Sequence, residues 1–222
     1  MHVSDLPDRS QDYLKAIWTA TEYSGGSAPL GELAARVGQK TTTASEAIRR
    51  LANKGLVKQE PYRGVMLTPE GRELAVAMVR RHRLLETFLV RVLDYTWDEV
   101  HEDAELLEHA VSDRFLARIE AHLEHPDRDP HGDPIPDAQG QVKKVEGVSL
   151  AAVGEGESVT VEQIDDRDPQ LLRYLADHGI VPGTRLTVPG VPVAGMLRVK
   201  VGDKEVTIAE TGLEDIRVQR GD

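Results

Sequence analysis

Metal-ligand side chains recur along the stretch HEDAELLEHAVSD, which begins at His101. Residues three and four positions apart share one face of an α-helix. If the stretch is helical, one face carries four such side chains, namely His101, Glu105, Glu108 and His109. Imidazole nitrogens and carboxylate oxygens together suit first-row divalent cations. The spacing therefore predicts a helix that supplies several ligands to a metal ion.

Two of these ligands stand where an amphipathic helix should be apolar. Glu108 and His109 directly follow Leu106 and Leu107. Burying both polar side chains without partners would cost roughly several kcal/mol, and a bound cation would remove that cost by satisfying them. The residues leave one alternative open, in which the acidic side chains form a solvated helix face.

A second pair of ligand-type residues stands upstream, in the segment 69–93, whose pattern predicts a long helix. His82 and Glu86 are four positions apart, which is about 6 Å of rise along one helical face. If this helix packs antiparallel against a helix predicted at 94–111, imidazoles and carboxylates from both helices converge. The chain has no cysteine, so any metal ion must be held by nitrogen and oxygen ligands.

These ligands do not follow the pattern of a metal-dependent hydrolase. Helical zinc-protease motifs place two histidines around a glutamate at a fixed spacing. Glu105 stands where such a histidine is required, both in HEDAE and in ELLEH. The chain also contains no glycine-rich phosphate loop and no nucleophile elbow. We therefore expect a binding protein rather than an enzyme, with no small organic substrate.

Charge is unevenly distributed along the 222 residues, whose formal net charge is -11. From Arg36 to Arg83 there are 11 Lys and Arg against 4 Asp and Glu, whereas from Leu84 to Asp137 there are 4 against 15. Local charge governs local binding, so the basic block suits phosphates and the acidic block suits cations. No apolar run approaches the roughly 20 residues of a membrane span, and the N-terminus lacks a secretion signal. We expect a cytoplasmic protein with no membrane partner.

The basic block coincides with the elements of a winged helix-turn-helix. Helical spacing at 12–23 and 30–37 is followed by a third helical segment at 41–55. An alternating segment at 56–68, with a turn at PYRG, predicts a two-stranded wing, and Pro69 opens the long helix. This order of elements is typical of a DNA-binding motif. The alternative is a generic small α+β domain.

The helix at 41–55 would be the recognition helix. Polar residues at its N-terminal end would face base edges, and arginines further along would contact phosphates. The alternative for each arginine is a solvated side chain. The predicted DNA-binding residues are Gln39, Lys40, Thr42, Thr43, Ser45, Glu46, Arg49, Arg50 and, at the tip of the wing, Arg63.

A further helix is predicted after Ser112, in the stretch SDRFLARIEAHLEH. Its Phe115, Leu116 and Ile119 would form a dimer surface or, alternatively, pack inside their own domain. The segment 126–141 is rich in Pro, Asp and Gly, which predicts an ordered turn or linker.

From Gly147 onward the pattern is that of short strands. Segments rich in Val and Thr are separated by glycine turns, and one helical segment, DPQLLRYLADHG, interrupts them. This spacing predicts a small β-barrel of five or six strands. The whole chain is then an α+β multidomain protein.

Four motifs, DYLKAIW, RRHRLLETFL, VHEDAELLEHAVSD and PHGDPIP, resemble the diphtheria-toxin-repressor family of metal-dependent transcriptional repressors, in particular its manganese-sensing subgroup. The resemblance covers nearly the whole chain. It implies a winged-helix DNA-binding domain at 1–74, an all-α dimerisation and metal-binding domain at 75–140, and an SH3-like, FeoA-type β-barrel at 146–220.

Carried over to this sequence, the resemblance implies two metal sites. The primary site would use Asp12, Glu105, Glu108 and His109. The ancillary site would use His82, Glu86 and His101, completed from the barrel by Gln163 and Asp166, for which Glu162 and Asp165 are alternatives.

The resemblance also concerns the choice of metal. Iron-sensing relatives carry a methionine where Asp12 stands and a cysteine where Glu105 stands, and the oxygen ligands here favour Mn²⁺, with Fe²⁺, Co²⁺ and Zn²⁺ as alternatives. Two-domain manganese sensors carry a glutamate where Lys15 stands. A paired-manganese cluster is therefore disfavoured, and two ions per subunit are expected in separate sites.

By the same resemblance, the protein would be a homodimer that binds a palindromic operator in double-stranded DNA and represses metal-ion uptake genes when metal is bound. A metal held by Asp12 and the dimerisation domain would set the spacing of the two recognition helices. An iron-dependent repressor of the same family is one alternative. The other is a winged-helix regulator controlled by a non-metal ligand, such as a small organic molecule or a protein bound to the barrel.

Overall fold

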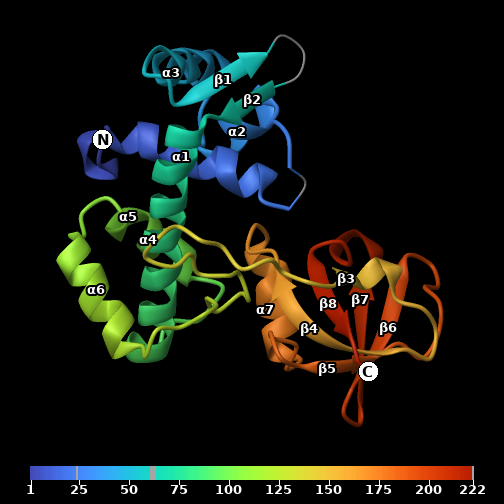
Figure 1. Ribbon diagram of the computed structural model, residues 1–222. Coiled ribbons are helices and arrows are strands. Elements are labelled where there is room, and N and C mark those ends of the chain that lie inside the picture. The colour runs from blue at the N-terminus through green and yellow to red at the C-terminus, as the bar shows by residue number, and fades with distance from the viewer. Residues whose placement is uncertain (24, 61–63, 222) are drawn as a thin grey trace. The chain divides into compact units, whose positions relative to one another are not determined.

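The computed structural model describes residues 1–23, 25–60 and 64–221. Their helices and strands confirm an α+β protein with a winged helix-turn-helix, a helical region and a small antiparallel barrel (Figure 1). The residues form two compact units. Unit 1 comprises Met1–His82, Leu107–Ser112 and Pro136–Gln141, and unit 2 comprises Arg83–Leu106, Asp113–Ile135 and Val142–Asp222.

Unit 1 contains the winged helix. Apolar residues at helical spacing bury one face of each helix, as Leu14 and Ile17 do on the first helix and Ile48 on the third. Its elements are the 3-10 helix η1 (Val3–Asp5), the helices α1 (Asp8–Thr21), α2 (Leu30–Arg36) and α3 (Thr41–Asn53), and the antiparallel strands β1 (Val57–Glu60) and β2 (Gly64–Leu67).

The long helix α4 (Pro69–Leu93) has the bounds that the sequence predicts. Thr68 Oγ1 accepts a hydrogen bond from Gly71 N at 3.0 Å and donates one to Gly55 O at 2.8 Å. One hydroxyl therefore caps the start of α4 and ties it to the chain that leaves α3. Gly71 lies against the backbone of Leu56, because a Cβ at Gly71 would be 1.8 Å from the Leu56 carbonyl oxygen.

The helical part of unit 2 includes the second half of α4, the helix α5 (Val100–Leu107) up to Leu106, and α6 (Asp113–His122). The helix predicted at 94–111 is shorter in the structure, with eight residues. Asp94 adopts a left-handed backbone conformation, φ 59°, which ends α4 and prevents a helix from starting there. The chain leaves the helical conformation again before Glu108.

The apolar residues of α6 do not share one environment. Leu116 and Ile119 are 8% and 3% exposed, so they are buried within the single chain. For these two residues, packing inside their own domain replaces the expectation of a dimer surface. Phe115 is 48% exposed and lies on the surface of the subunit.

The rest of unit 2 is a six-stranded antiparallel sheet in the order β3-β8-β4-β5-β6-β7, which confirms the predicted barrel. Alternating Val, Leu and Ile residues along the strands fill its core. Asp168 caps the helix α7 (Pro169–Asp177), which follows β4. The strands are β3 (Val148–Ser149), β4 (Ser158–Ile164), β5 (Arg185–Thr187), β6 (Met196–Val201), β7 (Lys204–Ala209) and β8 (Ile216–Arg220), with short 3-10 helices η2 (Leu150–Ala152) and η3 (Glu210–Gly212) between them.

Among the described residues, no helix combines the length and the apolar character that a membrane crossing requires.

Replacing Gly71 by alanine should destabilise the protein by about 2 kcal/mol, because the added Cβ meets the Leu56 carbonyl oxygen and overpacked sites typically cost ~1–3 kcal/mol. Urea unfolding followed by circular dichroism measures the change. Gly31→Ala is the matched control, since Gly31 lies within α2 and nothing stands within 4 Å of its Cβ position. That variant should be as stable as the wild type or up to ~1 kcal/mol more stable. Equal stability of the two variants would contradict the close approach at Gly71.

Candidate metal centres

The first candidate centre lies in unit 1, where Asp12, Glu108 and His109 come together. Asp12 is on α1, and the other two are in the turn that follows α5. His109 Nε2 lies 2.9 Å from Asp12 Oδ1 and 3.7 Å from Glu108 Oε1. The other ring nitrogen, Nδ1, lies 3.1 Å from Gln11 Oε1 and donates a hydrogen bond to it. This bond orients the ring and leaves Nε2 as the atom that can bind a metal.

Glu108 is fully buried and has two partners besides His109. The Lys15 ammonium lies 2.7 Å from its Oε1 and 2.9 Å from its Oε2, and His82 Nδ1 lies 2.6 Å from Oε2. Burial raises the pKa of Glu108, but His82 and Lys15 outweigh it and hold that pKa below its usual value. At Asp12, burial outweighs the effects of His109 and Lys15 and raises the pKa. The cluster is therefore a buried acid stabilised by nearby cationic groups.

Arg81 of α4 holds the turn that carries Glu108. Its Nη1 donates to the carbonyl oxygens of Glu108 at 3.4 Å and Val111 at 3.3 Å. Its Nη2 donates to Ser4 Oγ at 3.3 Å. A single buried guanidinium thus joins α4, this turn and η1.

The donor set of this centre fits a first-row divalent cation. Asp12 and Glu108 offer oxygen atoms and His109 offers a nitrogen. Glu108 Oε1 is buried and makes no hydrogen bond of acceptable geometry with any described residue, although Lys15 is 2.7 Å away. A metal ion would satisfy that oxygen atom and would replace the positive charge that Lys15 supplies.

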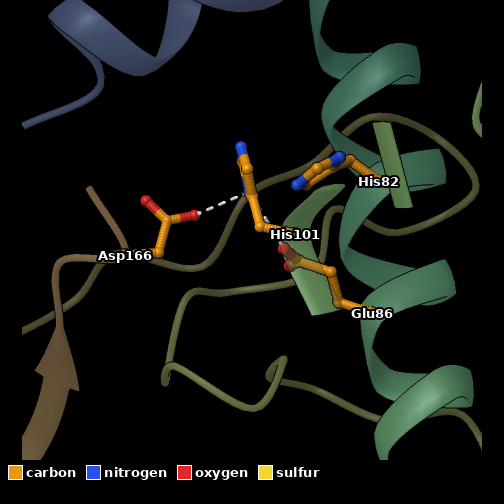
Figure 2. Close-up of side chains that lie close together, drawn as sticks. All are labelled: His82, Glu86, His101 and Asp166. Carbon is orange, nitrogen blue, oxygen red and sulfur yellow. Dashed lines mark hydrogen bonds and ion pairs between the residues drawn. The ribbon is translucent and has the colours of Figure 1, made fainter. Parts of the chain in front are cut away.

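The second candidate centre groups Glu86 of α4 and His101 of α5 with Asp166, which follows β4 (Figure 2). His101 Nδ1 lies 3.3 Å from Glu86 Oε1 and 3.3 Å from Asp166 Oδ2. His82 stands one turn before Glu86 on the same helix and belongs to the same group. Burial lowers the pKa of His101, but hydrogen bonds with Asp166, Glu105 and Glu86 raise it to about 12. Burial raises the pKa of Asp166, and the interaction with His101 outweighs it and lowers that pKa.

Glu105 lies beside the second group. Its Oε1 is 3.5 Å from His101 Nε2, and its side chain is 51% exposed. Glu105 does not belong to the first group, which consists of Asp12, Glu108 and His109. Helical periodicity relates Glu105 to His101 but does not extend to Glu108, since α5 ends at Leu107.

Of the barrel residues that the sequence suggested as ligands of the ancillary site, Asp166 belongs to the second group. Gln163 Nε2 donates to Asp133 Oδ1 at 2.7 Å, in the loop that follows α6. Glu162 and Asp165 each form an ion pair with an arginine.

A third group, Glu86, Asp129 and His131, was missed by sequence reasoning. Asp129 and His131 lie in the segment interpreted as a linker, where helical spacing gives no guide to partners. The motif PHGDPIP was the available signal, because it contains His131 and directly follows Asp129. Burial lowers the pKa of His131, but Glu86 and Asp129 raise it to about 9. Burial and the neighbouring Asp133 and Glu86 raise the pKa of Asp129 well above its usual value.

Most of the predicted DNA-binding residues lie along the side of α3 opposite its buried face, and Gln39 and Lys40 directly precede the helix. Ala44, Ile48 and Leu51 are buried, so the polar residues between them face outward. Arg63 lies outside the described residues. The exposed residues are Lys40, Thr42, Thr43, Ser45, Glu46, Arg49 and Arg50, and Gln39 is half-buried.

Comparison with known families matches nearly the whole chain. The iron dependent repressor N-terminal DNA binding domain matches residues 5–65. The iron dependent repressor metal binding and dimerisation domain matches residues 68–137, and the FeoA domain matches residues 148–220.

Individual relatives support these matches. The iron-dependent repressor IdeR of Mycobacterium leprae is 31% identical, over 98% of this chain and 100% of the relative. The diphtheria toxin repressor of Corynebacterium glutamicum is 32% identical, over 84% of this chain and 86% of the relative. The solved structure of a manganese-dependent transcriptional repressor in complex with manganese is 50% identical, covers 95% of this chain and 99% of its own, and has a TM-score of 0.89. The chain belongs to the diphtheria-toxin-repressor family of metal-dependent transcriptional repressors.

Proposed function

We propose that this protein is a manganese-activated repressor that binds a palindromic operator as a homodimer in the cytoplasm and controls metal-ion uptake genes. The observation that carries the proposal is the cluster of the buried Glu108 with the half-buried Asp12 and His109, whose oxygen-rich donor set suits Mn²⁺. The solved structure of a manganese-dependent repressor in complex with manganese, which is 50% identical to this chain, supports the choice of metal.

The proposed primary site uses Asp12, Glu108 and His109. Bound there, the cation would supply the positive charge that lets two carboxylates and an imidazole remain together. Asp12 lies on α1, against which the recognition helix α3 packs. By holding α1 to the turn after α5, these ligands would fix the orientation of α3. In a twofold dimer, that orientation sets the spacing of the two recognition helices on successive major grooves.

The proposed ancillary site uses Glu86, His101 and Asp166, with His82 from the preceding turn of α4. We assign Glu105 to this group as well, because its carboxylate contacts His101. The site takes one ligand from the segment after β4, so a metal there would link the helical region to the barrel within unit 2. These two sites would hold two ions per subunit, one in each.

Lys15 argues against a paired-metal primary site. Its ammonium already contacts both oxygens of Glu108, where a second ion would otherwise bind. Binding of one cation at Glu108 must displace this contact, since two positive charges at that distance repel each other. We therefore propose that Lys15 weakens metal binding at the primary site.

His109→Ala should abolish metal-stimulated DNA binding and leave the fold intact, because it removes the ring that links Asp12 to Glu108. For the wild type, adding Mn²⁺ should raise the affinity for a palindromic promoter fragment about 5- to 150-fold. Fluorescence anisotropy with chelator, then with Mn²⁺, Fe²⁺ and Zn²⁺ in turn, measures the effect.

The control for this experiment is His122→Ala, since His122 is exposed at the end of α6 and outside all three groups. It should keep the response of the wild type. Wild-type binding that is equal with and without metal would rule out a metal switch. A response to Fe²⁺ alone would assign the protein to the iron-dependent side of the family.

Lys15→Met should raise the affinity of the protein for Mn²⁺ about tenfold or more in the absence of DNA. A hydrogen bond to a charged group contributes ~1.5–3 kcal/mol, and each 1.4 kcal/mol is roughly a factor of ten in affinity. Isothermal titration calorimetry with the full chain measures it.

Lys15→Arg is the matched variant for that titration, because it keeps the positive charge and should bind Mn²⁺ as weakly as the wild type. If the methionine variant has wild-type affinity, Lys15 does not compete with the ion.

A further inference from the structure

We propose that unit 2 holds a further divalent-cation site, formed by Glu86, Asp129 and His131. All three side chains are buried, and one ligand atom from each lies within 4.8 Å of the other two. Glu86 comes from α4, whereas the other two come from the loop between α6 and β3. The inference rests on the proposed function only for the identity of the ion.

His131 presents a single ring nitrogen to this group. Its Nε2 lies 2.7 Å from the Trp97 carbonyl oxygen. Because a carbonyl oxygen can only accept, Nε2 is protonated and donates this hydrogen bond. Its Nδ1 is buried and has no hydrogen-bond partner among the described residues. A histidine whose outer nitrogen donates to a carbonyl group is oriented as metal-binding histidines usually are.

The distance from His131 Nδ1 to Glu86 Oε2 is 3.9 Å. It is too long for a hydrogen bond. Two ligands that each lie about 2.1 Å from one ion can be up to about 4.2 Å apart. The gap therefore fits a shared ion better than a direct contact.

The loop holds its ligands in place before any ion binds. Asp129 Oδ1 accepts hydrogen bonds from the backbone N–H groups of His131 and Asp133, both at 2.9 Å. Gly132 has φ +92°, and a Cβ there would be 2.1 Å from the Glu162 carbonyl oxygen. Ile164 N donates to His131 O at 2.9 Å. The loop is thus packed against β4 at the position of its ligands.

Glu86 belongs to two groups at once. Its Oε1 lies 3.3 Å from His101 Nδ1, and its Oε2 lies 3.9 Å from His131 Nδ1. The two oxygens of one carboxylate therefore face separate sets of ligands. Carboxylates that bridge two ions in this way are suited to paired divalent cations about 3.5–4 Å apart. Glu86 would join the proposed site to the ancillary site.

Arg83 sets the strength of the site. Its Nε lies 3.7 Å from Asp129 Oδ2, and its shorter contacts are to Pro134 O at 2.8 Å and Asp133 Oδ1 at 3.2 Å. The guanidinium holds the loop, but its charge repels a cation at Asp129. This repulsion weakens the site, so it fills only at a high Mn²⁺ concentration. One nitrogen and two oxygen donors suit Mn²⁺ with water completing its coordination.

The test is an anomalous difference map from crystals of the full-length wild-type protein in saturating Mn²⁺, together with the Mn²⁺ content after equilibrium dialysis. We expect three ions per subunit, one of them between Glu86, Asp129 and His131. His131→Phe keeps an aromatic ring beside Trp97 and removes Nδ1, so it should bind two ions. His178→Phe, at a histidine outside the three groups, should bind three.

A wild-type map with no anomalous peak at this position, or with water only, would overturn the inference. If His131→Phe fails to fold, the wild-type map decides alone. The result is separate from the proposed function, because the peak is observed without DNA. A peak in a protein whose DNA binding ignores Mn²⁺ would leave this site standing and remove the repressor proposal.

Discussion

The structure depends on one buried carboxylate, that of Glu108. A carboxylate with no exposure to water must have positive charge or hydrogen-bond donors around it, or it will take up a proton. Lys15, His82 and His109 provide that surrounding, and they come from α1, from α4 and from the neighbouring position in the chain. The segments that form this part of unit 1 are therefore held together by the need to neutralise a single acid. A metal ion is one more way to meet the same need.

Unit 2 also contains a buried carboxylate, that of Glu86, and different groups surround it. Glu86 is 1% exposed and lies close to two imidazoles, those of His101 and His131. In the loop with Asp129, two backbone N–H groups donate to Asp129 Oδ1, so the main chain fixes this carboxylate. Fixed donors of this kind give a site whose geometry exists before its ligand arrives.

The sequence predicted those features that follow from periodicity and capping. The bounds of α4 were predicted from its apolar pattern and the Thr68-Pro69 start, and the winged helix and the barrel followed from the order of short segments. Spacing also identified Glu86, His101 and the pair Glu108 and His109.

Other features could not be predicted because they depend on where helices end and on contacts between distant segments. The helix α5 stops at Leu107, so the three-residue spacing of Glu105 and Glu108 does not lie within one helix. The grouping of Asp129 and His131 with Glu86 depends on the path of an irregular loop, for which no periodic signal exists. The contact between Lys15 and Glu108 joins positions far apart in the chain.

The guanidinium of Arg81 has a consequence for the kinetics of the site. Because it bonds to Glu108 O, Val111 O and Ser4 Oγ together, the turn and the N-terminal 3-10 helix cannot open independently without leaving its donors unsatisfied. Segments linked in this way open as one cooperative unit. An ion held by Glu108 and His109 would then escape at the rate of that local opening, so its residence time would be set by a group that never touches it.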